Sequence, residues 1–115
     1  MASMQEIRQR LRGQRIEALR SGIAPLLAGR EGAEVWLFGS WARGDWDARS
    51  DVDLLAVAPH QSSADQLAED LLGEGLADDV IGISLARWME RRQGDDPWWR
   101  GIGRDAIRLQ PSPTP

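Results

Sequence analysis

The sequence predicts one small α/β (α+β) domain, in which a mixed sheet of three or four short strands is covered by helices. Three observations predict this class. The chain has 115 residues, enough for one hydrophobic core and too few for two domains. Short apolar, β-favouring runs alternate with longer segments of helical periodicity. Glycine and proline stand at many of the junctions between them.

The first helix is expected over about the first 29 residues. Five apolar residues fall on one stripe of this helix: Ile16, Leu19, Ile23, Leu26 and Leu27. Ile7 and Leu11 lie off that stripe. The first turns are therefore predicted to be a separate helix or a partner-facing extension, with a break near Gly13. Pro25 is expected to kink or restart the helix.

Two apolar strands are expected next. Residues 35–38, Val-Trp-Leu-Phe, form a short run that ends at Gly39, as a buried strand does. Residues 41–44 predict one helical turn stopped by glycine, followed by a polar loop over residues 45–50. The second strand is predicted from residue 52 to residue 58, where Pro59 closes it.

The second half of the chain alternates helix, strand and helices. Ser62 to Asp65 resembles a capping box that opens a helix with three leucines directed inward: Leu67, Leu71 and Leu72. A third strand is expected over residues 79–84, weakened by Gly82. Residues 85–92 predict a helix that buries Leu85, Trp88 and Met89. Asp96 and Pro97 suit the N-cap and first position of a last helix, which carries Ile102 and Ala106.

Composition excludes several classes of function. With 18 acidic and 14 basic residues, the chain is mildly acidic, which argues against direct nucleic-acid binding. A local basic cluster lies near the N-terminus and is predicted to be a solvated helix face: Arg8, Arg10, Arg12 and Arg15. No lysine is present for a Walker A motif, and no cysteine for thiolate chemistry. His60 is the only histidine, which excludes a mechanism that needs two.

No apolar run approaches a membrane span and no signal peptide is recognisable, so a cytoplasmic protein without membrane association is expected. Three segments are predicted. Residues 1–15 form an N-terminal helical extension, residues 16–109 form the folded domain, and residues 110–115 form a disordered, proline-rich tail. Whether the protein forms homo- or hetero-oligomers stays open.

The six tryptophans have several possible roles. Trp36 and Trp88 are expected in the core. Trp41 and Trp46 flank the turn after the first strand, where they could shield a ligand. Trp98 and Trp99 start the last helix, and they could face the core on one side and an interface on the other.

The chemistry is concentrated in two acids on the second strand. Side chains at positions i and i+2 of a strand point to the same face, so Asp51 and Asp53 direct two carboxylates at one point. Without a cation these groups would repel, which raises the pKa of one of them. Mg²⁺ suits such a pair because it combines one or two carboxylates with water and phosphate oxygens. The alternative is that both acids are solvated strand-edge charges.

A phosphate-binding turn is predicted just upstream. Gly39 permits close approach of a ligand to the backbone, and the N–H groups and hydroxyl around Ser40 can receive a phosphate. Ser40 is also expected to cap the short helix. Arg43, one turn further on, can point its guanidinium at the same triphosphate; otherwise it would form an ion pair with Asp45 or Asp47.

The pattern Gly-Ser, ten residues, Asp-x-Asp resembles the signature of the polymerase-beta-like nucleotidyltransferases. The version here, Leu-Phe-Gly-Ser-Trp-Ala-Arg-Gly followed by Ser-Asp-Val-Asp-Leu-Leu, is similar to the minimal nucleotidyltransferases (MNT) of prokaryotes. The resemblance covers roughly residues 16–109. It implies that Gly39, Ser40 and Arg43 bind the triphosphate and that Asp51 and Asp53 hold Mg²⁺.

The resemblance also implies a third carboxylate on the next strand. Asp79 fits that position and would share a face with Ile81 and Ile83, completing a catalytic and metal-binding set with Asp51 and Asp53. Asp78 is the rival, because a shift of one residue exchanges the two faces of a strand.

Minimal members of the family resemble antitoxins of HEPN/MNT toxin–antitoxin pairs. The implied function is a Mg²⁺-dependent nucleotidyltransferase that transfers AMP from ATP to a hydroxyl of a HEPN ribonuclease toxin, typically of a tyrosine, and so silences it (AMPylation). One alternative is an antitoxin that neutralises its partner by contact alone. Another is a small-molecule, aminoglycoside-like nucleotidyltransferase, which is less favoured because no substrate-binding second domain is evident.

Overall fold

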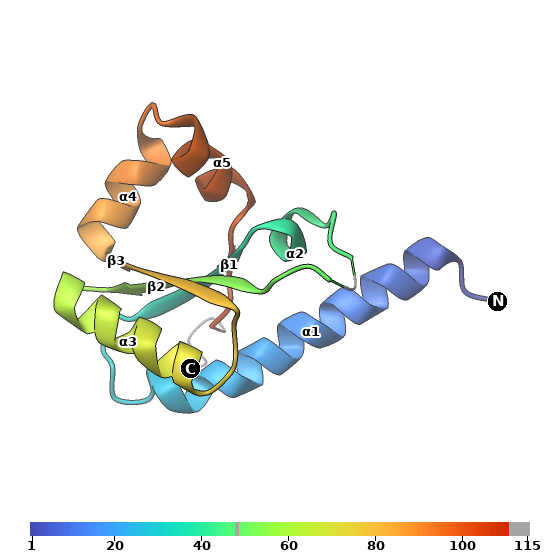
Figure 1. The fold of residues 1–115 in the computed structure, drawn as a ribbon, viewed down its shortest axis with the longest axis horizontal. Coiled ribbons are helices and arrows are strands. Elements are labelled where there is room, and N and C mark those ends of the chain that lie inside the picture. The colour runs from blue at the N-terminus through green and yellow to red at the C-terminus, as the bar shows by residue number, and fades with distance from the viewer. Residues whose placement is uncertain (48, 111–115) are drawn as a thin grey trace, which may run out of the picture.

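The computed structural model describes residues 1–47 and 49–110. A four-stranded mixed sheet forms its centre, with the strands in the order β3-β2-β1-β4 (Figure 1). β1 pairs antiparallel with both β2 and β4, and β2 pairs parallel with β3. The strand bounds are β1 Glu34–Phe38, β2 Asp53–Ala58, β3 Asp79–Ser84 and β4 Ile107–Arg108. The predicted α+β class with a small mixed sheet is confirmed.

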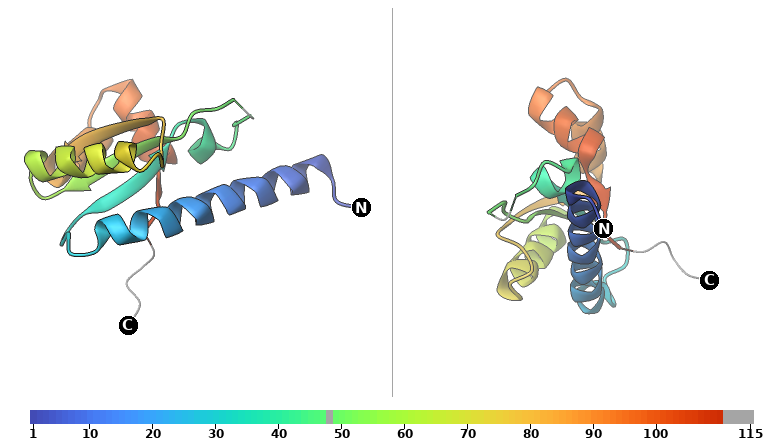
Figure 2. Two further views of the ribbon diagram at one scale, coloured as in Figure 1. Left: turned by 60° about the horizontal axis from the view of Figure 1, so that its bottom comes forward. Right: turned by 90° about the vertical axis from the view of Figure 1, so that its right-hand side faces the viewer.

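Helices cover both faces of this sheet. α1 and α3 pack on one face, and α4 and α5 on the other, while α2 follows directly from the end of β1 (Figures 1 and 2). The helix bounds are α1 Met4–Leu27, α2 Ser40–Arg43, α3 Gln61–Gly73, α4 Leu85–Gln93 and α5 Pro97–Asp105. None of the helices found in residues 1–47 and 49–110 is both long and apolar enough to cross a lipid bilayer.

Alternation along the strands divides the core between these two faces. Leu54 and Ala56 of β2 join the cluster beneath α1 and α3, whereas Leu55 and Val57 join the cluster beneath α4 and α5. All four side chains are fully buried. β2 is therefore the central apolar strand, and the polar residues at its start are held by a rigid support.

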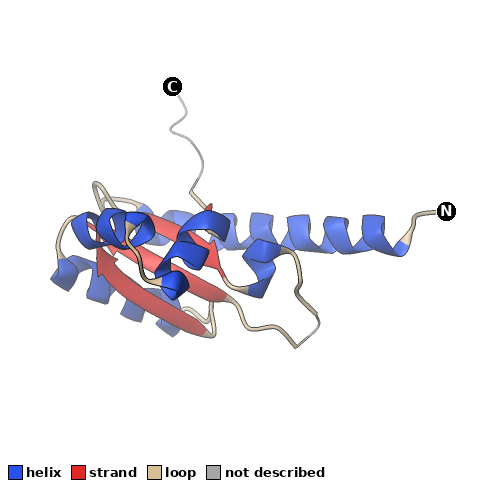
Figure 3. Ribbon diagram, turned by 90° about the horizontal axis from the view of Figure 1, so that it is seen from above, coloured by secondary structure: helices blue, strands red, loops and turns tan. Residues whose placement is uncertain are grey.

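α1 differs from its prediction because it is one continuous helix of 24 residues. The break expected near Gly13 is absent, and the helix passes through Pro25 to end two residues later. Pro25 has no N–H to donate to the Ser21 carbonyl, so one helical hydrogen bond is missing just before the helix ends. Figure 3 shows the N-terminal half of α1 extending past the end of the sheet.

Several local predictions for α3 and α4 are wrong. His60, not a serine, is the N-cap of α3, so the capping box does not form. The side-chain amide of Gln61 connects the start of α3 to β3. It donates to Asp65 Oδ1 and to the Gly82 carbonyl, and it accepts the N–H of Ser84. Leu72 and Met89 are exposed, because the residue before each of them lies on the helix face that packs against the core. Those neighbours are Leu71 and Trp88.

The predicted strand over residues 79–84 and the Asp96–Pro97 start of the last helix are confirmed. Asp96 Oδ1 accepts the N–H groups of Trp98 and Trp99, as an N-cap does. The prediction of a disordered tail concerns residues 110–115, of which residues 111–115 lie outside the described part of the chain.

Candidate functional site

The site is built on one transverse row of the sheet. Phe38 at the end of β1 pairs with Asp53 at the start of β2, and Asp53 pairs with Asp79 at the start of β3. Paired residues on neighbouring strands point to the same face. That face is the one covered by α4 and α5, because Leu55 and Ile83, two and four residues further along β2 and β3, are buried there. The row therefore places two carboxylates beside each other under α5.

A cleft of about 610 Å³ opens over this row. It is lined by all six residues predicted from the sequence to bind metal or triphosphate: Gly39, Ser40, Arg43, Asp51, Asp53 and Asp79. They come from the β1–α2 turn, the segment entering β2 and the start of β3. The structure thus brings the two motifs together around one space. The prediction that Asp51 and Asp53 alternate on one strand is wrong, because β2 begins at Asp53 and Asp51 lies in the segment before it.

Gly39 makes the turn from β1 into α2 possible. Its φ of 79° and ψ of −157° lie in a region that is essentially confined to glycine. A Cβ at this position would meet Asp53 Oδ2 at 2.5 Å. The absence of a side chain therefore serves the backbone turn and also leaves room for the Asp53 carboxylate.

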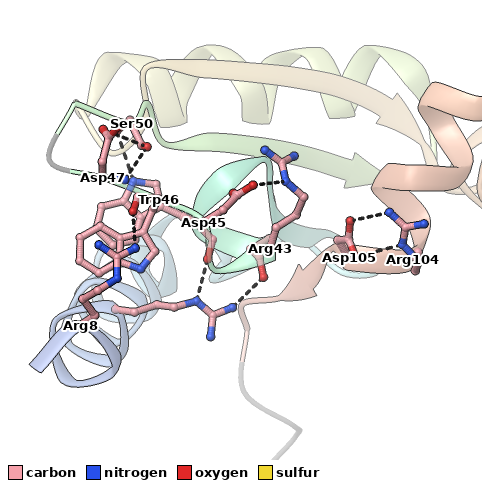
Figure 4. A network of polar contacts seen from close by, with 11 residues as sticks. Arg8, Arg43, Asp45, Trp46, Asp47, Ser50, Arg104 and Asp105 are labelled. Carbon is pink, nitrogen blue, oxygen red and sulfur yellow. Dashed lines mark hydrogen bonds and ion pairs between the residues drawn. The ribbon is translucent and has the colours of Figure 1, made fainter. Parts of the chain in front are cut away.

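Ser40 and Arg43 follow on α2. Gly39, not Ser40, is the N-cap, and no side-chain hydrogen bond caps this helix, so the predicted capping role of Ser40 is wrong. The backbone N–H groups of Ser40 and Trp41 stand in the first turn, where they have no partner within the helix. Arg43 forms the alternative ion pair that the sequence suggested, with Nε 3.2 Å from Asp45 Oδ2, and it also lines the cleft (Figure 4).

Electrostatics around Asp53 are dominated by other acids. Partial burial raises the pKa of Asp53, and the charges of Asp79, Asp51 and Asp78 raise it further, while Arg43 lowers it. The ionised form of Asp53 is thus held at a cost in the ligand-free protein. A cation in the cleft would remove that cost.

Asp78 and Asp79 have different environments. Asp78 Oδ2 accepts the N–H of Val52 at 2.8 Å, and the Asp78 N–H donates to the Val52 carbonyl at 2.9 Å. Asp78 therefore fastens the entry of β3 to that of β2. Asp79, by contrast, lines the cleft and is in register with Asp53. This arrangement favours Asp79 as the third carboxylate of the site.

The donor set suits a hard divalent cation. Asp51, Asp53 and Asp79 offer only carboxylate oxygens, which are the ligands Mg²⁺ takes, and an open cleft leaves space for phosphate oxygens. Among residues 1–47 and 49–110, however, no three acidic, histidine or cysteine side chains are close enough together to enclose an ion. The residues fit the metal by their chemistry, while Mg²⁺ itself stays a prediction.

Two arginines of α1 donate hydrogen bonds to α2 and to the segment that follows it. Arg12 donates from Nε to the Trp41 carbonyl and from Nη2 to the Ala42 carbonyl, both at 2.7 Å. Arg8 donates to the Trp46 carbonyl, and its guanidinium lies 4.5 Å from the Trp46 ring centroid (Figure 4). The predicted solvated face is therefore wrong for these two arginines, because they bind the α2 region.

Trp41 and Trp46 do not shield the cleft. Their rings stack on each other with centroids 4.2 Å apart, and both are buried against α1 rather than lining the cleft. The guanidinium of Arg15 lies 5.1 Å from the Trp41 ring centroid. The two tryptophans stabilise the docking of α1, which short-range sequence patterns do not reveal.

The sequence did not predict that residues of α5 line the cleft. Trp98, Ile102 and Asp105 fall at i, i+4 and i+7, which places them on one helical face, and all three line the cleft. Arg104 also lines it and forms an ion pair with Asp105 at 3.2 Å (Figure 4). The spacing was visible in the sequence, but nothing in it showed which face of α5 covers the sheet.

Comparison with known protein families matches residues 21–93 to the family described as "Nucleotidyltransferase domain". This segment contains all six predicted site residues and ends before α5 begins. Comparison with curated proteins and with solved structures found no match.

Proposed function

The chain belongs to the nucleotidyltransferase domain family, and we propose that it transfers AMP from ATP to a hydroxyl group on a partner protein. The observation that carries this proposal is the cleft in which Asp51, Asp53 and Asp79 face the Gly39–Ser40 turn. Its two halves suit the two needs of nucleotidyl transfer, which are acids for a divalent cation and donors for a triphosphate.

The residues divide the chemical work as follows. Ser40, through its N–H and hydroxyl, and Arg43, through its guanidinium, bind the triphosphate and orient its α-phosphorus. Asp51 and Asp53 hold Mg²⁺, which when bound stabilises the charge on the attacking and leaving oxygens. Asp79 accepts the proton of the acceptor hydroxyl. The acceptor oxygen bonds to the α-phosphorus, the bond from that phosphorus to the bridging oxygen breaks, and pyrophosphate leaves.

Arg43 must leave its ion pair with Asp45 before its guanidinium can bind a triphosphate. Both side chains are about half exposed, so the pair contributes little and is readily exchanged for a triphosphate. Arg43 then turns from a single carboxylate to a group of higher charge. Asp45 is expected to hold the guanidinium in position before the nucleotide binds.

The acceptor follows from the resemblance to minimal nucleotidyltransferases. We propose that it is a tyrosine hydroxyl of a HEPN-family ribonuclease toxin encoded by the neighbouring gene, and that this chain is the antitoxin. The cleft is open to solvent, which supports a macromolecular acceptor.

The proposal is tested by incubating the protein with Mg²⁺, α-labelled ATP and the product of the neighbouring gene. Label should appear on that product and pyrophosphate should be released. Asp51→Ala and Asp53→Ala should each abolish transfer, as should chelation of the metal. Asp95→Asn serves as a matched control, because this exposed acid does not line the cleft and should retain full activity.

Two results would contradict the proposal. If the Asp51→Ala and Asp53→Ala proteins still neutralise the partner and no label is found on it, contact alone accounts for neutralisation. If label is transferred to an aminoglycoside but not to the partner, the acceptor is a small molecule.

A further inference from the structure

The cleft has a charged side and an apolar side. The apolar side is contributed mainly by α5 and the sheet beneath it: Phe38, Ile81, Pro97, Trp98 and Ile102. Trp98 stands out there because it is 54% exposed, whereas Trp41, Trp46 and Trp88 are all less than a tenth exposed. A large aromatic ring left open inside a cleft is available for contact with a ligand.

The position of Trp98 relative to the charged side follows from helix geometry. Trp98 stands at the first turn of α5 and Asp105 at its last residue, which separates them by about 10 Å along the helix axis. The charge of Arg43 reaches Asp105, where it helps lower the pKa of that carboxyl after the hydrogen bond from Arg104. Arg43 and Asp105 both line the cleft and lie near each other in Figure 4, whereas Trp98 is at the opposite end of α5.

The indole of Trp98 is held in place by its neighbours. It contacts the Trp99 ring edge to face, with centroids 4.9 Å apart and planes at 85°. Trp99 in turn packs 6.4 Å from Trp88, which is fully buried. Asp96 fixes the Trp98 backbone through the N-cap hydrogen bond. A ring fixed in this way loses little conformational entropy when a second ring stacks on it.

We propose that Trp98 is a stacking platform for the nucleobase of the bound triphosphate and that it selects purines over pyrimidines by stacking area. This inference rests on the proposed function, because it assigns the base end of the same nucleotide. The charged end, with Ser40 and Arg43, takes the phosphates. Trp98 lies on α5, outside the segment matched to the family, residues 21–93.

The residues that line the apolar side give no means of distinguishing adenine from guanine, so selectivity should extend only to purines over pyrimidines. None of its side chains can read the hydrogen-bonding edge of a base, apart from the indole N–H of Trp98 itself. The backbone N–H groups at the start of α5 are already taken by Asp96. Arg104 and Asp105 are paired with each other. Stacking is tolerant of base identity and strengthens with ring area, so adenine and guanine should bind alike.

The test measures binding of Mg²⁺ complexes of ATP, GTP, CTP, UTP and inorganic tripolyphosphate by calorimetry, without an acceptor. Wild-type protein should bind the two purine nucleotides alike and several-fold more tightly than the pyrimidines. Trp98→Ala should weaken ATP binding about tenfold, reduce the purine preference and leave tripolyphosphate binding unchanged. Trp98→Phe should restore most of the ATP affinity. Met89→Ala, which removes a similarly exposed side chain outside the cleft, should change nothing.

The outcomes separate this inference from the proposed function. If wild-type protein binds ATP but Trp98→Ala binds it equally well, the platform is overturned and the nucleotidyltransferase assignment stands. A parallel loss of tripolyphosphate binding in Trp98→Ala would also overturn it, because the defect would then be general. Equal binding of all four nucleotides would overturn the purine selectivity. If wild-type protein binds no nucleotide at all, the proposed function itself fails.

Discussion

Gly39 occupies the most constrained position of the site, because its backbone angles exclude other residues and its missing side chain makes room for Asp53. Gly39→Ala should lower the free energy of unfolding by about 1–3 kcal/mol through backbone strain. It should also displace the Asp53 carboxylate and abolish Mg²⁺-dependent ATP binding. Chemical denaturation and calorimetry measure the two effects.

Gly44→Ala is the matched control for this substitution. Gly44 also has a positive φ, of 94°, but a Cβ there would meet nothing within 4 Å. This variant should lose stability through strain alone and keep its ATP affinity. Equal ATP binding by both variants would show that the Gly39–Asp53 contact has no part in the site.

Asp53 should show opposite effects on stability and function. Its pKa is raised in the folded protein, so its contribution to stability is present below its usual pKa of 3.8 and is lost as the pH rises through the folded-state value. At neutral pH, Asp53→Asn should therefore stabilise the ligand-free protein by at most roughly 0.5 kcal/mol, since it removes a partly buried charge and its like-charge contact with Asp79, both of which solvent screens. Unfolding curves of both proteins between pH 3 and pH 8 measure this difference.

The same variant should lose its response to ligand. Mg²⁺ and ATP together should raise the Tm of the wild-type protein by binding the folded state, and should leave the Tm of Asp53→Asn unchanged. If ligand stabilises both proteins equally, Asp53 is not part of the binding site. If the stability difference between the two proteins does not grow as the pH rises, ionisation of Asp53 is not its cause.

Among the elements, α2 has too few residues to be stable alone, and its position depends on α1. Arg12 donates two hydrogen bonds to carbonyls of this short helix. Arg12→Ala would leave both carbonyls without a charged donor, so it should cost about 1–3 kcal/mol of stability. It should also weaken ATP binding, although Arg12 does not line the cleft. Chemical denaturation measures the free energy of unfolding, and calorimetry measures the affinity for ATP.

Arg10→Ala is the natural comparison, since Arg10 lies on the same helix and its exposed side chain makes no hydrogen bond or ion pair with any residue that the structure describes. Stability and ATP affinity should both stay at wild-type values. If Arg10→Ala loses as much stability and ATP affinity as Arg12→Ala, the effect comes from the charge of α1 and not from the hydrogen bonds of Arg12 to α2.

At the scale of the whole molecule, residues 1–15 were predicted to be an extension outside the folded domain. The structure joins this segment to the domain through contacts of Arg8, Arg12 and Arg15 with the α2 region. Deleting residues 1–15 should lower the stability by about 2–5 kcal/mol, the combined effect of lost hydrogen bonds and cation–π contacts. Thermal unfolding of the truncated protein measures it, and an unchanged Tm would restore the segment to the status of an independent extension.

The sequence predicted the helices and strands well where an apolar pattern is bounded by glycine, proline or a capping residue. The strand ending at Phe38 is followed by Gly39, the central strand is closed by Pro59, and Asp96–Pro97 starts a helix, and each of these boundaries is present in the structure. Predictions failed where two local signals competed. Ser62 suggested a cap but His60 holds that position, since the Gln61 amide ties the helix to β3.

The sequence by itself determined the two acids, the glycine turn and their spacing, because the start of an apolar strand and the conformational freedom of glycine are local properties. Only the tertiary structure decided what surrounds them. The brace from α1 and the wall from α5 join residues about 30 to 60 positions apart, such as Arg12 with Trp41 and Trp98 with the row at Asp53. Such contacts depend on how helices pack across the sheet, and helical periodicity defines the faces of a helix without stating which face is covered.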